Sequence, residues 1–235
     1  HPEGVTPGNS STNPGDAQIV RGMQHLNDAF RNQGVYSDDG RAAKDGDNPD
    51  RELMKSQDIK IEFCLAKRDI NGNETNGILR YETDTYSDLN SNRDSEMKNW
   101  VRSRNGRAFP TDSYLNIYLV NVICDGSPNN PANCRTLGYA YLAGAHGRTF
   151  DGIVNMARYF GTRTDLSKVH VHEVGHYLNL DHTFGGECGG DDCLRGGDRV
   201  CDTPPDNSTV RVDCGTRQNS CSNDAAGGFF TIDHE

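Results

Sequence analysis

The sequence predicts an α+β fold in which short helices and strands are separated by long ordered loops. The chain contains both segments with the apolar repeat of a helix and segments rich in β-branched and aromatic residues. Only 33% of the residues are hydrophobic, and the polar excess consists of Asn, Asp, Gly, Ser and Thr, which favour turns. The length of 235 residues suits one domain of ordinary size, or one domain in two lobes.

The N-terminal part of the chain contains two predicted helices and one predicted strand. Apolar residues recur at spacings of three and four over residues 16–30, which predicts a helix, and Asp16 can serve as its N-cap. From Ile59 to Leu65 apolar and polar residues alternate, as in a strand with one buried face. Cys64 would point to the opposite face, where we expect a free, buried thiol. A short helix is expected over residues 94–101.

Three further strands are predicted, over residues 114–123, 137–143 and 152–160. The first is the clearest, because β-branched and aromatic residues dominate it. A loop rich in Pro and Asn separates the first two strands. Cys124 and Cys134 bracket this loop, and we expect a disulfide between them to close it.

Residues 172–182 read HEVGHYLNLDH and carry the most chemical information in the chain. We expect a helix over residues 166–178. His172 and His176 are four residues apart, so they lie one turn apart on the same helix face, where two imidazoles can share one metal ion. Glu173 directly follows the first histidine, and its carboxylate can reach a water on the metal without binding the metal itself.

A third histidine, His182, lies six residues after His176, and a straight helix would carry it out of reach. The chain must therefore turn back, and Asn179 is the candidate because Asn tolerates the left-handed conformation best after Gly. Three neutral histidines with one open position form a catalytic zinc site. The alternative is a pair of solvent-facing histidines on an ordinary helix. It is disfavoured because the third histidine stands at the required offset.

The motif HExxHxxxxxH is the zinc signature of the metzincins. With HEVGHYLNLDHTF, the segments LGYAYL, DGIVNMARYFG and GDRVCDTPP resemble the pappalysin family of metzincin endopeptidases. The resemblance runs from about residue 16 to the end of the chain. Asn179 departs from the pattern, because most members have Gly there.

The resemblance implies a metzincin-like α+β fold with two lobes. The upper lobe, residues 1–182, would hold a twisted, mostly parallel sheet with an antiparallel edge strand, and two long helices. The lower lobe, residues 183–235, would be irregular and rich in disulfides, with the cleft between the lobes. The edge strand would bind an extended peptide by main-chain pairing, through Tyr139, Ala140, Tyr141 and Leu142.

Two further departures concern the ends of the chain. No apolar strand precedes Asp16, although family members usually begin with one. No Met-turn follows the zinc motif, so we expect the chain to be a fragment whose lower lobe stops before that turn.

The function implied by the resemblance is that of a secreted zinc metalloendopeptidase that hydrolyses peptide bonds in proteins. A zinc-bound water would attack the peptide carbonyl, with Glu173 as the general base. The alternative is a catalytically silent extracellular binding module that keeps zinc as a structural relic. The intact Glu173 argues against this alternative, since zinc binding alone does not require it.

The last fifty residues are rich in Gly, Asp and Cys. The chain has eight cysteines, most of them after residue 187, which indicates disulfides and an oxidising compartment. A second, cysteine-based zinc site is the alternative, but the CxxC pairs that such sites favour are absent from the sequence. The family resemblance implies a bond between Cys193 and Cys221 and a partner for Cys214 beyond residue 235. An additional pair is expected between Cys188 and Cys201.

Calcium is the second metal that the resemblance implies. Asp198, Asp202 and the carbonyl of Thr203 match family positions that bind structural calcium, and Gly-Asp clusters suit such hard-cation loops. The alternative is a solvated acidic loop.

The composition limits the partners. A net charge of −10 argues against nucleic acid or an anionic membrane surface, and no apolar run approaches the eighteen residues of a membrane span. The expected partners are protein or peptide substrates, and we expect a monomer.

Overall fold

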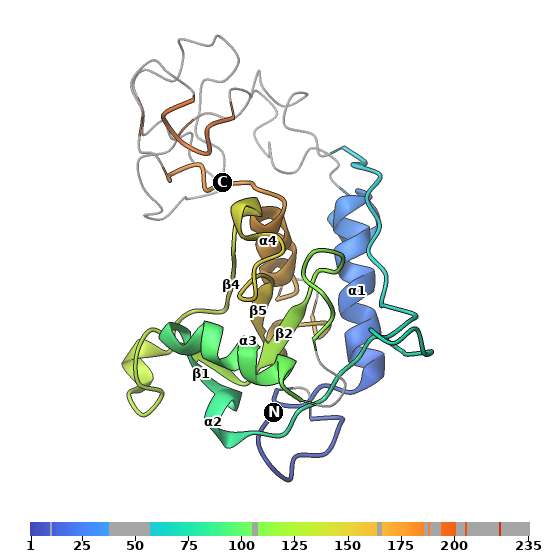
Figure 1. The fold of residues 1–235 in the computed structure, drawn as a ribbon. Coiled ribbons are helices and arrows are strands. Elements are labelled where there is room, and N and C mark those ends of the chain that lie inside the picture. The colour runs from blue at the N-terminus through green and yellow to red at the C-terminus, as the bar shows by residue number, and fades with distance from the viewer. Residues whose placement is uncertain are drawn as a thin grey trace. The chain divides into compact units, whose positions relative to one another are not determined.

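The structure is a computed structural model that describes residues 1–9, 11–37, 57–104, 108–163, 166–185, 188, 194–200, 205 and 221. The chain forms two compact units. The first comprises His1–Val35 and Ile59–Asn179, and the second comprises Tyr36–Asp58 and Leu180–Glu235. In the described residues, all α-helices and β-strands belong to the first unit (Figure 1). None of the described helices has the length and apolar character needed to cross a membrane.

The central sheet has the strand order β2-β5-β4. Strand β2 (Ile117–Val120) runs parallel to β5 (Ile153–Met156), and β4 (Gly138–Ala140) runs antiparallel to β5 at the edge. A second sheet pairs β1 (Asp88–Asn90) with β3 (Val122–Cys124) in parallel. The structure thus contains the antiparallel edge strand on a mostly parallel arrangement that the family resemblance implies.

The predicted strand over residues 114–123 is wrong as one element, because it is divided between the two sheets. Its first part is β2 and its last part begins β3. Asn121 lies between them and bonds to the start of β1 and the residue before it: its backbone N–H donates to the Ser87 carbonyl at 2.8 Å. Its side-chain Nδ2 donates to Asp88 Oδ1 at 2.6 Å. These bonds turn the chain from one sheet into the other.

The described residues form four α-helices, which accompany the sheets. They are α1 (Asp16–Phe30), α2 (Asp84–Ser87), α3 (Asp94–Arg102) and α4 (Lys168–Tyr177). Asp16 is the first residue of α1 rather than its N-cap, a position that Gly15 occupies. Its carboxylate instead pairs with Arg80 at 2.5 Å.

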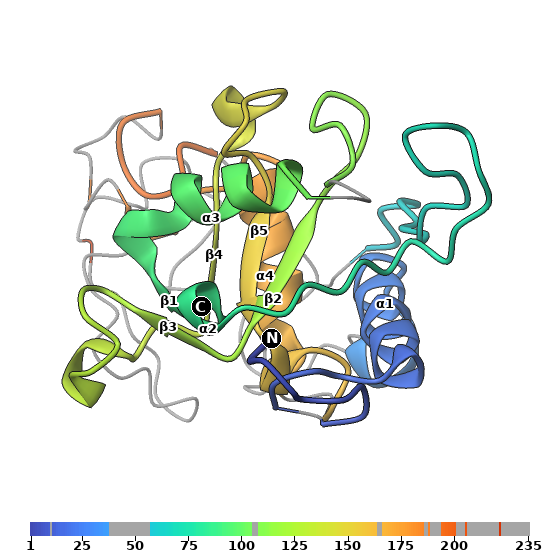
Figure 2. The same cartoon turned by 60° about the horizontal axis from the view of Figure 1, so that its bottom comes forward.

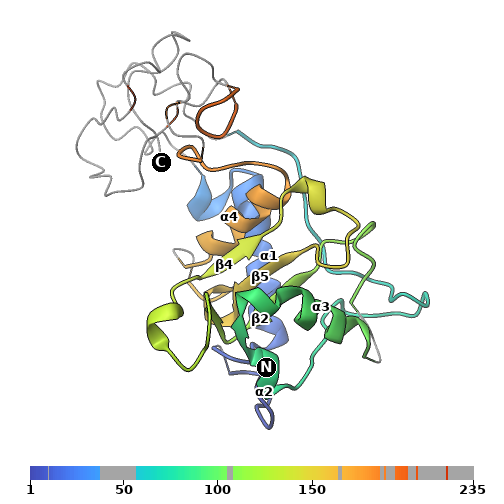
Figure 3. The same cartoon turned by 60° about the vertical axis from the view of Figure 1, so that its left-hand side comes forward.

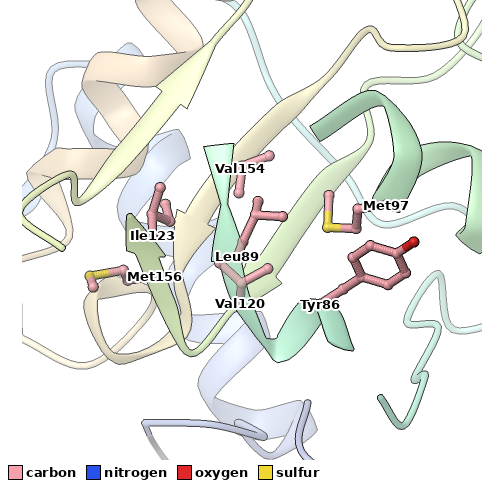
Figure 4. Packing of buried hydrophobic residues seen from close by; sticks show 7 residues of the cluster. All are labelled: Tyr86, Leu89, Met97, Val120, Ile123, Val154 and Met156. Atoms are coloured by element: carbon pink, nitrogen blue, oxygen red, sulfur yellow. The ribbon is translucent and has the colours of Figure 1, made fainter. Parts of the chain in front are cut away.

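Two apolar clusters lie on opposite faces of the sheet, because side chains alternate along β5. Val154 and Met156 belong to the cluster on the α3 side, which Figure 4 shows, whereas Ile153 packs with residues of α1 and α4. Figures 2 and 3 show the sheet between α3 on one face and α4 on the other. The strand alternation therefore places α4 directly against β4 and β5.

Helix α4 is held against α1 by contacts between distant parts of the chain. His170 Nε2 lies 3.0 Å from the Gly22 carbonyl, and its ring packs on Phe160 with centroids 4.7 Å apart. A Cβ at Gly22 would overlap the Phe160 ring. Glycine at position 22 thus allows the close approach of α1 to the Phe160 segment.

The predicted strand from Ile59 to Leu65 is wrong. This segment has no strand assignment in the structure, and Ile59 is 57% exposed. The side chain of Asn27 instead bonds to both backbone groups of Phe63. It accepts a hydrogen bond from the Phe63 N–H at 2.7 Å and donates one to the Phe63 carbonyl at 2.9 Å. Cys64 is a free thiol, but it is exposed rather than buried, whereas Ile61 and Phe63 of the same segment pack against the apolar cluster that contains Phe30.

One of the predicted disulfide bonds is confirmed by the structure. The structure joins Cys124 to Cys134, as the sequence predicts. It also joins Cys188 to Cys221. That bond corrects both predictions for this region, Cys193 with Cys221 and Cys188 with Cys201, because each thiol can form only one disulfide. Spacing alone does not determine connectivity in a cysteine-rich loop.

Candidate metal centre

Helix α4 presents the first two candidate ligands. His172 and His176 lie one turn apart, and their ring centroids are 4.6 Å apart with the rings nearly perpendicular at 87°. The helix ends at Tyr177. The Leu178 N–H still bonds to the Val174 carbonyl at 3.0 Å, so the helical geometry continues to the point where the chain turns.

The turn occurs at Asn179, whose φ of 79° confirms the predicted left-handed conformation. Its N–H donates to the His176 carbonyl at 2.8 Å. Beyond the turn, His182 stacks on Phe184 with centroids 4.5 Å apart. The ligand atoms of His172, His176 and His182 all lie within 4.8 Å of one another. Three imidazole nitrogens in such a group suit a zinc ion with an open fourth position.

Glu173 lies on α4 beside the first ligand. It is only 6% exposed, and burial raises the pKa of its carboxyl to about 7. The neighbouring backbone is that of β4: a Cβ built on Gly138 would lie 3.0 Å from Glu173 Cγ and 2.8 Å from Asn155 Nδ2. Glycine at position 138 therefore lets the edge strand pass directly over the Glu173 side chain.

Three other histidines lie near these elements but outside the group. His170 is fully buried, and burial lowers its pKa to about 4. His146 Nε2 lies 3.1 Å from the Tyr177 carbonyl. His25 Nδ1 lies 2.7 Å from Ser167 Oγ. Each therefore has a structural partner.

The predicted peptide-binding residues lie on and just after β4. Tyr139 and Ala140 belong to the strand, whereas Tyr141 and Leu142 follow it. In the described sheet β4 pairs only with β5, so its other edge has no strand beside it there. The Tyr139 and Tyr141 hydroxyls donate to the two oxygens of Asp94, at 2.7 and 3.0 Å.

Comparison with known proteins identifies the family. The family model described as pregnancy-associated plasma protein-A, peptidase M43, matches residues 104–230, more than half of the chain. The chain belongs to this family. The resemblance to the pappalysins that the motifs indicate is therefore confirmed.

Relatives of this pappalysin-family chain include fungal proteins. An extracellular metalloprotease of Pyricularia oryzae is 32% identical over 138 residues, which cover 53% of this chain and 44% of the relative. One of Verticillium alfalfae is 34% identical over 142 residues, with 54% and 45% covered. The chain spans less than half the length of these curated relatives.

Solved structures of mirolysin share the fold. Mature mirolysin of Tannerella forsythia in complex with a cleaved peptide superposes with a TM-score of 0.61 and 27% identity. That match covers 97% of this chain and 83% of the other. Mirolysin in complex with compound 9 gives a TM-score of 0.63 and 29% identity over 93% of this chain and 77% of the other. The metzincin-like α+β fold class is thereby confirmed.

The calcium residues expected from the pappalysin resemblance are only partly described. Asp198 Oδ1 accepts the Val200 N–H at 2.9 Å. Asp202 and Thr203 lie outside the described residues, as do Cys193 and Cys201. Calcium therefore stays a prediction.

Several residues that support the pappalysin site were not predicted from the sequence. Gly138 lies close to both Glu173 and Asn155, and the buried pair Asp94 and Lys98 bonds to the tyrosines of the edge-strand segment. An Asp and a Lys four residues apart on a polar helix are typical of an exposed pair. The feature of the sequence that could have indicated these residues is the glycine at position 138, which stands next to the two tyrosines of LGYAYL.

Proposed function

We propose that this chain is the zinc-binding part of a secreted metalloendopeptidase that hydrolyses peptide bonds in proteins. The observation that carries the proposal is the group of three histidines within 4.8 Å, with the buried Glu173 one residue from the first of them. The printed names of the fungal relatives, extracellular metalloproteases, support both the activity and the secretion. The cleaved peptide in the mirolysin complex supports a peptide substrate.

His172, His176 and His182 would hold the zinc ion. Zinc in such a site supplies a Lewis acid and lowers the pKa of water in its open position toward about 7. The residues fit this role because all three side chains offer neutral nitrogen donors. The described residues contain no other group of histidine, cysteine and carboxylate side chains with this geometry.

Glu173 would act as the general base and then as the general acid. It takes one proton from the attacking water as the oxygen bonds to the peptide carbonyl carbon. It then gives a proton to the leaving amine nitrogen as the carbon–nitrogen bond breaks. Its place on α4, next to His172 but pointing under β4, suits a group that works beside the metal without ligating it.

Strand β4 would bind the substrate. A peptide in extended form can add to a free sheet edge, where main-chain hydrogen bonds provide affinity. Residues 139–142 would supply those bonds. The segment Gly138 to Ala140 lies over Glu173, so a peptide paired with it runs past the proposed base.

The test compares Glu173→Gln with the exposed control Glu74→Gln in the full-length protein. Glu173→Gln should keep its zinc and lose peptide hydrolysis by at least about 10²-fold, the smaller contribution typical of a general base. The control should behave as the wild type. Zinc retained together with undiminished hydrolysis would exclude Glu173 as the base. A zinc-loaded wild type that binds peptides without cleaving them would instead favour the binding-module alternative.

A further inference from the structure

A buried charge pair that the proposed reaction does not use lies behind the edge strand. Lys98 is fully buried and Asp94 is 3% exposed, and Lys98 Nζ lies 3.0 Å from Asp94 Oδ1. Both residues belong to α3 and are four positions apart. Charged side chains are almost never fully buried unless they are paired. Even a buried pair loses the hydration of both charges, and this desolvation costs free energy.

Most partners of the pair come from β4 and the residue that follows it. Tyr139 donates to Asp94 Oδ1 and Tyr141 to Oδ2, so both carboxylate oxygens are occupied. The Lys98 ammonium donates to the Phe150 carbonyl at 2.7 Å. It also lies 4.7 Å from the ring centroid of Tyr141 and 5.9 Å from that of Tyr139, within the range of cation–π attraction.

Stability alone does not explain such a pair. A buried ion pair can often be replaced by apolar residues without loss of stability, because the desolvation cost of the charges is large. What the pair provides is directional: a carboxylate with two fixed oxygens accepts two hydroxyl groups at defined points. The pair therefore sets the position of the tyrosines that bond to it.

Fixing these two tyrosines also fixes β4, because Tyr139 belongs to the strand and Tyr141 directly follows its last residue. Tyr139 and Tyr141 are two residues apart and face α3, whereas Gly138 and Ala140 face α4. On that second face, a Cβ at Gly138 would lie 3.0 Å from Glu173 Cγ. Ala140 packs against the cluster that contains Val174. In the described sheet β4 is three residues long and pairs only with β5. Few other backbone hydrogen bonds therefore fix the distance between β4 and α4.

We propose that Asp94 and Lys98 are positioning residues that hold the peptide-binding edge strand β4 at a fixed place over Glu173, through the hydroxyl groups of Tyr139 and Tyr141. This inference rests on the proposed function, in which β4 pairs with the substrate. It assigns a role in substrate affinity to residues on the opposite face of the sheet from the metal ligands.

The experiment uses the full-length protein with the variants Tyr139→Phe, Tyr141→Phe and the double replacement Asp94→Leu with Lys98→Met. Tyr118→Phe is the matched control. Its ring also faces Lys98, at 5.4 Å, but it belongs to β2, and its buried hydroxyl has no hydrogen-bond partner among the described residues.

Each tyrosine variant should raise KM for an extended peptide by about tenfold, the factor expected when a hydrogen bond to a charged group is lost. The kcat value should change less than about twofold, because binding is lost equally in the ground state and the transition state. The double replacement removes both charges and leaves the two tyrosine hydroxyls without their acceptor, so it should show the same raised KM. Zinc content should stay unchanged throughout.

Amide hydrogen exchange of β4 is the readout that does not require activity. It should be faster in the double replacement than in the wild type, and unchanged in Tyr118→Phe. Wild-type KM and wild-type exchange in the double replacement would overturn the proposal, as would an equal loss in the Tyr118→Phe control. If the wild-type protein cleaves no peptide, the proposed function fails, and the exchange measurement alone decides whether the pair positions β4.

Discussion

Asn179 determines whether His182 can reach the other two histidines. Its φ of 79° turns the chain immediately after α4. Gly adopts this conformation without strain, and a β-branched residue is the least tolerant of it. Asn179→Gly should therefore keep one zinc per chain, whereas Asn179→Val should lose most of it. Metal analysis of both purified variants checks this, and full zinc in Asn179→Val would contradict it.

The three-histidine model makes a second prediction at the same scale. His182→Ala should lose zinc, because two imidazoles and solvent hold the ion far more weakly than three. His25→Ala is the control, since His25 bonds to Ser167 and lies outside the group. Metal analysis should find about one zinc per chain in the control. Undiminished zinc in His182→Ala would refute the model.

These residue-scale features could be predicted because they are local. The positions of His172, His176, Asn179 and His182 depend on one helix and one turn, so the spacing in the sequence nearly determines the geometry. Gly138 could not be predicted in the same way. Its role depends on β4 passing over α4, which is a contact between distant segments.

At the scale of elements, the close approach of α1 to Phe160 depends on Gly22. An added methyl group there would overlap the Phe160 ring, so Gly22→Ala should destabilise the protein by about 1–3 kcal/mol through overpacking. Gly144→Ala is the matched control, because a Cβ at that position meets no atom within 4 Å. Urea unfolding measures both variants. Equal midpoints would show that the ring moves aside without cost.

The helices were easier to predict than the strands. The limits of α1 agree with the apolar repeat, and α3 extends one residue beyond the prediction, because a helix completes its own backbone hydrogen bonds. A strand needs a partner. The segment from Ile59 to Leu65 has the alternation of a strand, yet the side chain of Asn27 bonds to its backbone. Alternation therefore identifies extended chain and leaves its pairing open.

At the scale of the whole molecule, calcium should stabilise the region after residue 182. Asp191, Asp192, Asp198 and Asp202 stand close in the sequence, and their mutual repulsion opposes a compact loop unless a cation is bound. A calcium-selective chelator should lower the melting temperature and speed the digestion of residues 183–235 while zinc content stays constant. The melt and limited proteolysis measure this, with added calcium as the control. An unchanged melt and digestion pattern would leave the acidic stretch as a solvated surface.

The division of the chain into lobes at residue 182 stays a prediction. Features of the whole molecule are the hardest to predict from the sequence, and the disulfides show why. Cys124 and Cys134 lie ten residues apart on one loop, and their bond could be predicted. Cys188 and Cys221 are separated by 33 residues. Many loop paths are compatible with such a spacing, so the family pattern suggested other partners.

The contacts that join α1 to α4 have a consequence for how the protein is made. His170 meets the Gly22 carbonyl across 148 residues of chain, and Ser167 meets His25 across 142. A ribosome adds about 5–20 residues per second, so the first helix waits about 7–30 seconds before its partner exists. During that time the apolar face of the first helix has no cover from the helix that carries the metal ligands. Contacts this distant in sequence also slow folding after release. The helix that carries the proposed metal ligands therefore reaches its place against α1 only after nearly the whole intervening chain has been made.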